Sequence, residues 1–479
     1  MNKKFKLLML LPLGITSLLG AVRNEASTMV SAADVNYDTV ITTQEEFDTF
    51  MSEVSTSGED VTITKNVSLK TDVSLTLPET VASYAAFGGV FNGNNHTITL
   101  SSATNEVERS AMFHYMTGTF KNTIFEGSVT GATRLSTVCI YNLGGLIENV
   151  TSYVNFNSTG LYSGTICAMT NDGSNSSERA IVKNCVNYGD FTVTNKENHY
   201  CGGIVGYTYQ NSSIIDCTNY GNISGVAGIL GGITGYTRTT TSDKTTIVKN
   251  CKNYGDVTSG SGHLGGIVGW TGNEIEFINC DNYGDIETTS NFGAGGIAGT
   301  YQASADSSYL KIANCYNGGN VRGRYIGGIL GHIDGNSKKS SKVNFINTIT
   351  AGNVTQTTGS GYVGQFCGNG KSTAYYTLTN CYTLNKYSYL SGATNVYKFM
   401  GSSLYEGDGI HDLTDNNGVS DNVRAYIQAV RDHNCENTEA TQQKLLATQS
   451  SSSLSLIINL IGVPLKSKAL RIEFSKYLL

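Results

Sequence analysis

The heptapeptide NCVNYGD, Asn184–Asp190, decides how this chain is read, because close copies of it recur along the sequence. The copies are DCTNYGN from Asp216, NCKNYGD from Asn250, NCDNYGD from Asn279 and NCYNGGN from Asn314, with weaker echoes NTITAGN from Asn347 and NCYTLN from Asn380. Their second letters lie 29–35 residues apart. A second block alternates with them: GGIVGYT from Gly202, GGITGYT from Gly231, GGIVGWT from Gly265, GGIAGTY from Gly295 and GGILGHI from Gly327. A repeat near 33 residues indicates one supersecondary unit stacked many times.

The content of each unit favours β-structure. Helical repeats of this length need long amphipathic helical runs, whereas these units are punctuated by Gly and carry short β-branched segments. We read three short strands in each unit, always in the same order. The chain is therefore predicted to be all-β: a parallel β-helix, or solenoid, of about ten coils in which equivalent positions stack at the ~4.8 Å strand spacing.

The recurring Asn has a structural role in this interpretation. Val182 and Cys185 cannot both face inward along a straight strand, because successive side chains alternate between faces, so a bend must lie near Asn184. Stacked amides at that bend can hydrogen-bond from coil to coil. The predicted Asn ladder consists of Asn184, Asn250, Asn279, Asn314, Asn347 and Asn380, with Asp216 as a variant rung. The glycines that follow, such as Gly189 and Gly221, are expected to supply the turn at positive φ.

The chain has eleven cysteines, and ten of them lie within the repeats. Cys139, Cys167 and Cys367 align with Gly206 and its equivalents, which predicts a buried column of small residues. We expect buried free thiols; a disulfide between Cys139 and Cys167 on neighbouring coils and a metal site are the alternatives. No metal-binding spacing of the CxxC kind is present, so neither a metal nor a cofactor is expected.

The chain ends differ from the repeats. Basic residues at Lys3, Lys4 and Lys6 precede the apolar run Leu7–Val22, and VSA ending at Ala32 fits a signal-peptide cleavage site, so we expect export to the cell surface or medium. The segment TTQEEFDTFMSEV, with Thr43 and Glu46 at capping-box spacing, predicts a helix that covers the first coil. The expected boundaries are 1–32 signal peptide, 33–84 N-terminal cap, 85–395 β-helix, 396–449 a partly helical C-terminal cap, and 450–479 a low-complexity basic tail.

Charge and hydropathy restrict the partners. Removal of residues 1–32 takes away Lys3, Lys4, Lys6 and Arg23 against Glu25, so the net charge falls from −6 to −9. With no basic stripe, nucleic acid is not expected as a partner. The longest later apolar run, Leu454–Leu465, covers about half of the ~20 residues that a transmembrane helix needs, so no spanning segment is expected.

Over residues 136–390 the two alternating blocks resemble the GLUG-motif repeats of bacterial surface proteins. The resemblance implies an extracellular, right-handed parallel β-helix of the kind found in adhesins and in the non-catalytic repeat regions of immunoglobulin-A-cleaving metallopeptidases. The HExxH motif of those peptidases is missing from this chain, so the resemblance does not carry peptidase activity.

Two functions follow from these observations. The first is an exported, non-enzymatic, adhesin-like monomer that binds an extracellular glycan or a host or cell-surface protein through an aromatic strip of Tyr207, Tyr236 and Trp270, followed in register by Thr300 and His332. The alternative is a polysaccharide-active lyase or glycoside hydrolase, which needs clustered carboxylates. The acidic row Asp190, Asp256 and Asp285 recurs too regularly for an active site, so we expect turn chemistry there and no enzyme activity.

Overall fold

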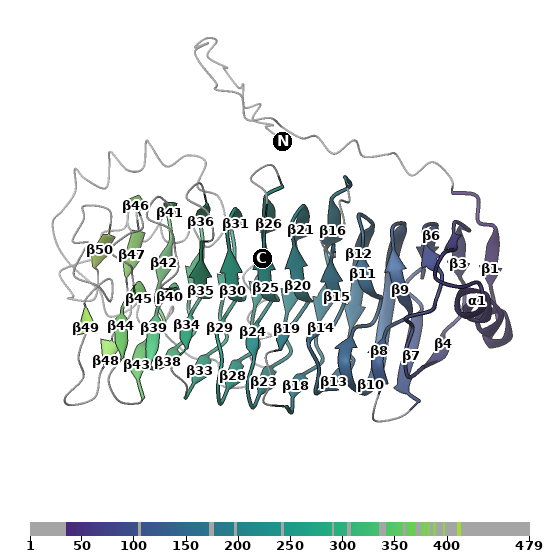
Figure 1. Cartoon of the computed structure of the whole chain (residues 1–479), viewed down its shortest axis with the longest axis horizontal. Helices are drawn as coiled ribbons and strands as arrows, with labels where there is room; N and C mark the ends of the chain where they lie inside the picture. Colours follow the sequence, from purple (N-terminus) through teal and green to yellow (C-terminus); the bar gives the residue numbers. More distant parts are fainter. Residues whose placement is uncertain are drawn as a thin grey trace, which may run out of the picture. The chain divides into compact units, whose positions relative to one another are not determined.

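A computed structural model describes most of the chain between residues 35 and 412 (Figure 1). The described residues are 35–103, 107–171, 177–195, 199–240, 244–289, 292–303, 308–334, 342–357, 361–369, 375–379, 381–383, 387–388, 396–397 and 410–412. The chain divides into Met1–Asn36 and Tyr37–Leu479, and the second unit carries every described strand and helix. The expected signal peptide, Asn380, the helical part of the expected C-terminal cap and the tail lie outside the described residues.

The described part is a parallel β-solenoid of about ten coils, which confirms the predicted fold class. Every strand pairing between coils is parallel, and equivalent letters of the repeat are register partners, as Val182 and Ile214 are. Each full coil has five short strands rather than the three predicted. The Asn of the repeat divides the first predicted strand into two, and the Gly-Gly-Ile block contains two strands with a bend between them.

Successive coils in the regular part follow the same order. They are β16 (Ala180–Lys183), β17 (Val186–Asn187), β18 (Phe191–Val193), β19 (Tyr200–Gly202), β20 (Val205–Tyr209); β21 (Ser212–Ile215), β22 (Thr218–Asn219), β23 (Ile223–Gly225), β24 (Ile229–Gly231), β25 (Thr234–Arg238); β26 (Thr246–Lys249), β27 (Lys252–Asn253), β28 (Val257–Ser259), β29 (Leu264–Gly265), β30 (Val268–Gly272); β31 (Ile275–Ile278), β32 (Asp281–Asn282), β33 (Ile286–Thr288), β34 (Gly293–Gly295), β35 (Ala298–Gln302); β36 (Tyr309–Ala313), β37 (Tyr316–Asn317), β38 (Val321–Gly323), β39 (Tyr325–Gly327), β40 (Leu330–Ile333); β41 (Lys342–Ile346), β42 (Ile349–Thr350), β43 (Val354–Gln356), β44 (Tyr362–Gly364) and β45 (Cys367–Asn369).

Parallel pairing already begins at Thr39, inside the segment that the sequence assigned to the cap. The early strands are β1 (Thr39–Ile41), β2 (Thr62–Ile63), β3 (Val67–Leu69), β4 (Val73–Leu77), β5 (Ala86–Phe87), β6 (Val90–Asn92), β7 (Thr97–Ser102), β8 (Val107–Ser110), β9 (Phe113–Met116), β10 (Thr119–Leu135), β11 (Cys139–Asn142), β12 (Leu146–Ser152), β13 (Asn155–Ser158), β14 (Tyr162–Gly164) and β15 (Cys167–Thr170). The last described strands are β46 (Tyr375–Thr379), β47 (Cys381–Thr383), β48 (Tyr387–Ser388), β49 (Val396–Tyr397) and β50 (Ile410–Asp412).

The single helix of the described residues, α1 (Gln44–Thr56), confirms the predicted N-terminal capping helix. Thr43 is its N-cap and Glu46 completes the capping box, so the first-turn N–H groups are satisfied. The buried residues of the helix include Phe50, whose ring packs against Phe87, Phe91 and Phe113 at centroid distances of 6.1–6.4 Å. The helix therefore covers apolar residues of the first coils.

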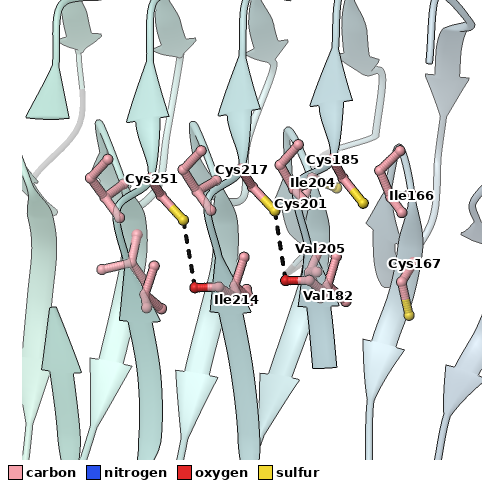
Figure 2. Packing of buried hydrophobic residues seen from close by; sticks show 14 of the residues in the cluster. Ile166, Cys167, Val182, Cys185, Cys201, Ile204, Val205, Ile214, Cys217 and Cys251 are labelled. Carbon is pink, nitrogen blue, oxygen red and sulfur yellow. Dashed lines mark hydrogen bonds between the residues drawn. The ribbon is translucent and has the colours of Figure 1, made fainter. Parts of the chain in front are cut away.

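The interior repeats from coil to coil. Val182 and Cys185 are both fully buried, although they are three positions apart and would face opposite sides of a straight strand. Asn184 explains this, because it lies in the left-handed region at φ 50° and turns the chain. Figure 2 shows the resulting column of Cys185, Cys217 and Cys251 among apolar side chains. Each thiol donates to carbonyls, as Cys217 Sγ does to Val182 O at 3.7 Å.

The prediction about the turn glycines was wrong. Gly189 and its equivalents were expected at positive φ, but the residues that adopt it are the Asn or Asp rungs, from Asn184 to Asn347. The glycine is required by close approach instead: a Cβ at Gly255 would lie 1.8 Å from the carbonyl oxygen of Gly221 on the preceding coil.

Candidate functional site

The aromatic row of Tyr207, Tyr236 and Trp270 lies on three adjacent strands, β20, β25 and β30. The residues are register partners, so the parallel ladder places their side chains one above another. The Tyr207 and Tyr236 rings stack at 5.0 Å between centroids, and Trp270 follows at 5.6 Å with its plane tilted by 47°. Thr300 is the next register partner, so this aromatic row ends at Trp270.

Exposure divides the row. Tyr207 is 7% exposed, whereas Tyr236 and Trp270 are half-buried. Burial raises the pKa of Tyr207 and raises that of Tyr236 to about 12, so both phenols are neutral at physiological pH. Within the described residues the Nε1 of Trp270 is buried and has no hydrogen-bond partner. The row therefore presents to a ligand the edges of uncharged phenol rings and an indole ring, and no charged group.

Neighbouring aromatic residues widen this surface. On strand β19, Tyr200 stacks on Tyr236 at 4.9 Å, and on β14 Tyr162 stacks on Tyr200 at 5.2 Å. At the other end the His263 ring lies 4.7 Å from both Trp270 and Phe292, and Phe292 is 44% exposed. The sequence analysis did not identify this extension. The column that holds His263 also carries Tyr162, Tyr200, Tyr325 and Tyr362, but these tyrosines lie outside the two repeated blocks.

His263 is neutral in this arrangement. Burial, with a smaller contribution from the charge of His332, lowers the pKa of His263 to about 3. Its Nδ1 lies 2.6 Å from the Thr300 hydroxyl, which fixes the ring beside Trp270. The residues after Trp270 in the predicted strip, Thr300 and His332, are buried and half-buried respectively.

The second tyrosine row is less suitable for stacking on a ligand. Tyr153, Tyr188, Tyr220, Tyr254 and Tyr283 stack in sequence with centroids 4.8–4.9 Å apart and planes within 8° of parallel. Each ring covers the faces of its neighbours, so the row presents mainly edges and hydroxyl groups. This stack is consistent with cross-strand stabilisation.

The predicted Asn ladder residues are hydrogen-bonded from coil to coil. The Nδ2 of Asn184 donates to Asn149 Oδ1 at 2.6 Å, and Asn279, Asn314 and Asn347 each donate to the rung before them at 3.0–3.1 Å. Each amide thus donates toward the preceding coil. Asn250 donates to Asp216 at 2.8 Å, and the Asp216 carboxylate cannot donate onward.

A second, fully buried ladder was missed. It consists of the fourth letter of the repeat: Asn187, Asn219, Asn253, Asn282 and Asn317. Each of the first four donates to the next coil at 2.8 Å, in the opposite direction to the outer ladder. This Asn recurs in the five close copies of the repeat, but its inward orientation depends on the left-handed bend three residues earlier.

The acidic row accepts backbone N–H groups. Asp190 Oδ1 accepts from the N–H of Asn222, Asp256 from Asp285, and Asp285 from Asn320, all at 2.8–2.9 Å. These carboxylates therefore link consecutive turns and do not converge on one point. Among the described residues no group of three or more His, Cys, Asp or Glu side chains is placed to hold a metal ion.

The cysteine columns differ from the prediction in register. Cys139, Cys167 and Cys367 align with Val205 and Leu330, one position before Gly206 and Gly331. The two positions are adjacent in the sequence, so the one-residue offset was not visible without the strand register. The column of these cysteines also accepts larger residues, including Phe113 and Leu330. Cys139 and Cys167 are register partners with sulfurs 3.8 Å apart; both are buried thiols, beyond the ~2.05 Å of a disulfide bond.

Comparisons with known proteins give one structural likeness. No family model matches the chain, and no curated protein does. A crystal structure described as "a putative immunoglobulin A1 protease from Bacteroides ovatus" is 18% identical over 52% of this chain and 76% of that chain, with a TM-score of 0.42. The described residues include no helix long and apolar enough to cross a membrane.

Proposed function

We propose that this chain is an exported, non-enzymatic interaction protein that binds extracellular carbohydrate through the aromatic surface of Tyr200, Tyr236, Trp270 and Phe292. The observation that carries the proposal is the half-buried Trp270, which ends its row and lies between a tyrosine stack and an exposed phenylalanine. Sugar rings bind the faces of aromatic side chains through apolar contacts. A cluster of exposed aromatic side chains on a folded protein often marks a binding site.

Three further points support the proposal. The sequence of residues 1–32 has the composition of a signal peptide, which supports export. The alternating blocks resemble GLUG-motif repeats, and we assign the chain to that group of surface or secreted proteins. The regular carboxylates accept backbone hydrogen bonds, which favours a binding protein over a lyase or glycoside hydrolase.

The test is retention and cleavage measured together. The full chain is incubated with a panel of polysaccharides and host glycoproteins, and each mixture is scored for bound protein and for new fragments. We expect retention without cleavage, and a loss of roughly tenfold or more in affinity for Trp270→Ala, since stacking on one aromatic ring is worth about 1–3 kcal/mol.

Tyr153→Ala is the matched control, because Tyr153 is a 47% exposed ring at the end of the other tyrosine row. Retention that Tyr153→Ala reduces as much as Trp270→Ala would exclude the proposed surface. Fragments that appear with the wild-type protein would establish the enzyme alternative. Retention of the chain by a host protein from which the glycans have been removed would indicate a protein ligand.

A further inference from the structure

Two arginines lie at the start of the aromatic surface. Arg109 on β8 and Arg134 on β10 are register partners in adjacent coils. The same alignment continues to Tyr162 on β14, since Leu135 N–H donates to Ser163 Oγ one residue further on. The Arg134 guanidinium carbon lies 5.3 Å from the centroid of the Tyr162 ring. These two residues are called the arginine pair below.

The arginine pair is poorly neutralised by the protein. Within the described part of the chain Arg109 has one ion pair, Nε to Glu108 Oε1 at 3.9 Å, with a carboxylate that is 55% exposed, and Arg134 has none. The Nε atoms of both arginines are buried and have no hydrogen-bond partner there. Like charges opposite each other on paired strands repel, and a guanidinium carries five N–H donors. An anion bridging the two would satisfy both.

The surroundings of the pair are aromatic rather than acidic. His114 is 3% exposed, and its ring lies 4.0 Å from that of Tyr115 and 5.6 Å from that of Tyr141. Burial, and then the charges of Arg109 and Arg134, lower the pKa of His114 to about 4. The imidazole is therefore neutral at physiological pH. An approaching anionic group meets two guanidinium ions beside flat apolar rings.

The position of the pair connects it to the proposed carbohydrate surface. Arg134 contacts Tyr162, Tyr162 stacks on Tyr200, and Tyr200 stacks on Tyr236 beside Trp270. Five coil steps separate the Arg109 and His263 positions of this alignment, which is roughly 24 Å at the spacing of parallel strands. A ligand that reaches both ends is an oligosaccharide or longer.

We propose that the arginine pair binds a carboxylate or sulfate group of an acidic polysaccharide whose neighbouring sugar rings lie on the aromatic surface. The inference rests on the proposed carbohydrate-binding function and names its ligand class. Guanidinium groups bind carboxylates and sulfates through paired, charge-assisted hydrogen bonds. The net charge, −9 after removal of residues 1–32, does not prevent this, because charges beyond the Debye length of about 8 Å are screened at physiological salt.

The test uses matched charged and neutral polymers. Polygalacturonate is compared with its fully methyl-esterified form, and dextran sulfate with dextran, so that the first pair reports carboxylate and the second sulfate. Binding to the full-length protein is followed by affinity electrophoresis and by the emission of Trp270, the single tryptophan of the chain. The variants are Arg109→Gln, Arg134→Gln and Arg134→Lys, with Arg322→Gln as the control, an exposed arginine on β38 outside the cluster.

We expect wild-type protein to bind one charged polymer at least about tenfold more tightly than its neutral parent, the range of one or two charge-assisted hydrogen bonds. Each Gln variant should bring that ratio close to one while binding of the neutral polymer is retained. Arg134→Lys should keep part of the preference, and Arg322→Gln all of it. Unchanged melting temperatures establish that the variants fold.

Two results overturn the inference. Equal binding of charged and neutral polymers by wild-type protein, or a charge preference that survives both Gln substitutions, excludes the arginine pair while leaving the carbohydrate proposal in place. Failure of every polysaccharide, charged or neutral, to bind would instead remove the carbohydrate proposal and this inference together.

Discussion

At the scale of single residues, the Asn of the repeat has two roles that other residues cannot combine. Asn250 adopts φ 55°, donates its amide to Asp216 and accepts from Asn279. Asn is enriched in the left-handed region, where other non-Gly residues are strained by roughly 1–2 kcal/mol. Its side chain bends the coil and also links it to its neighbours.

Substitution at this position separates the two roles. We expect Asn250→Ala to lower the free energy of unfolding by about 3 kcal/mol, through backbone strain and the loss of two partly exposed hydrogen bonds. Asn250→Gly loses the same two hydrogen bonds but tolerates the conformation, so it should be about 1 kcal/mol more stable than the Ala variant. Urea titration followed by circular dichroism measures both. Equal costs for Ala and Gly would contradict a backbone role.

Repetition in the sequence predicted which residues stack, but not their orientation. Asn184 and Cys185 were assigned from recurrence alone, whereas the positive φ was given to Gly189 instead of the Asn. The sequence shows that two positions in different repeats are equivalent. The backbone angles are needed to decide which face a side chain occupies and to detect a register difference of one residue. The same limit explains why the cysteines were aligned with Gly206 rather than Val205.

At the scale of elements, α1 was predicted in position, capping and buried face, because a helix end has a local chemical signature. The strands were predicted in order but not in number, since bends at Asn184 and within the Gly-Gly-Ile block depend on tertiary packing. The early coils were the most difficult to predict, because their sequence lacks the regular repeat. Arg109 and Arg134 lie in these coils at a spacing that does not recur, so they were not identified.

The helix should be held to the first coils mainly by Phe50. Truncation of this 3% exposed ring, which packs on three phenylalanines, is expected to cost about 3–5 kcal/mol. In a solenoid each unit contacts only its neighbours, so the loss should appear first as local opening of α1. Hydrogen exchange over residues 44–56 should then become roughly a hundredfold faster in Phe50→Ala.

Ser52→Ala on the exposed side of the same helix is the control and should change the exchange by little. Equal protection of α1 in the wild-type protein and in Phe50→Ala would show that the helix does not depend on this contact. Uniformly faster exchange in all coils would show instead that the solenoid unfolds as one cooperative unit.

At the scale of the whole molecule, burial of ionisable groups predicts a stability plateau bounded on both sides. Burial raises the pKa of the Cys367 and Cys381 thiols to about 12, above the usual value of 9.0. These thiols are neutral in the folded protein, so their contribution to stability is complete below pH 9 and is lost as the pH rises toward 12.

The acidic limit is set by two histidines. Burial lowers the pKa of His114 to about 4 and of His263 to about 3, from 6.5. Their contribution is complete above pH 6.5 and is lost as the pH falls.

The melting temperature should therefore be highest and nearly constant between about pH 6.5 and 9, and should fall on either side. His114→Leu tests the acidic side, because a shift from 6.5 to about 4 in a 3% exposed imidazole corresponds to about 3 kcal/mol at pH 4. Between pH 8 and pH 4, the melting temperature of the variant should fall by less than that of the wild-type protein. Identical pH profiles for the two proteins would mean that His114 is protonated in the folded state, and the neutral surroundings inferred for the arginine pair would then be wrong.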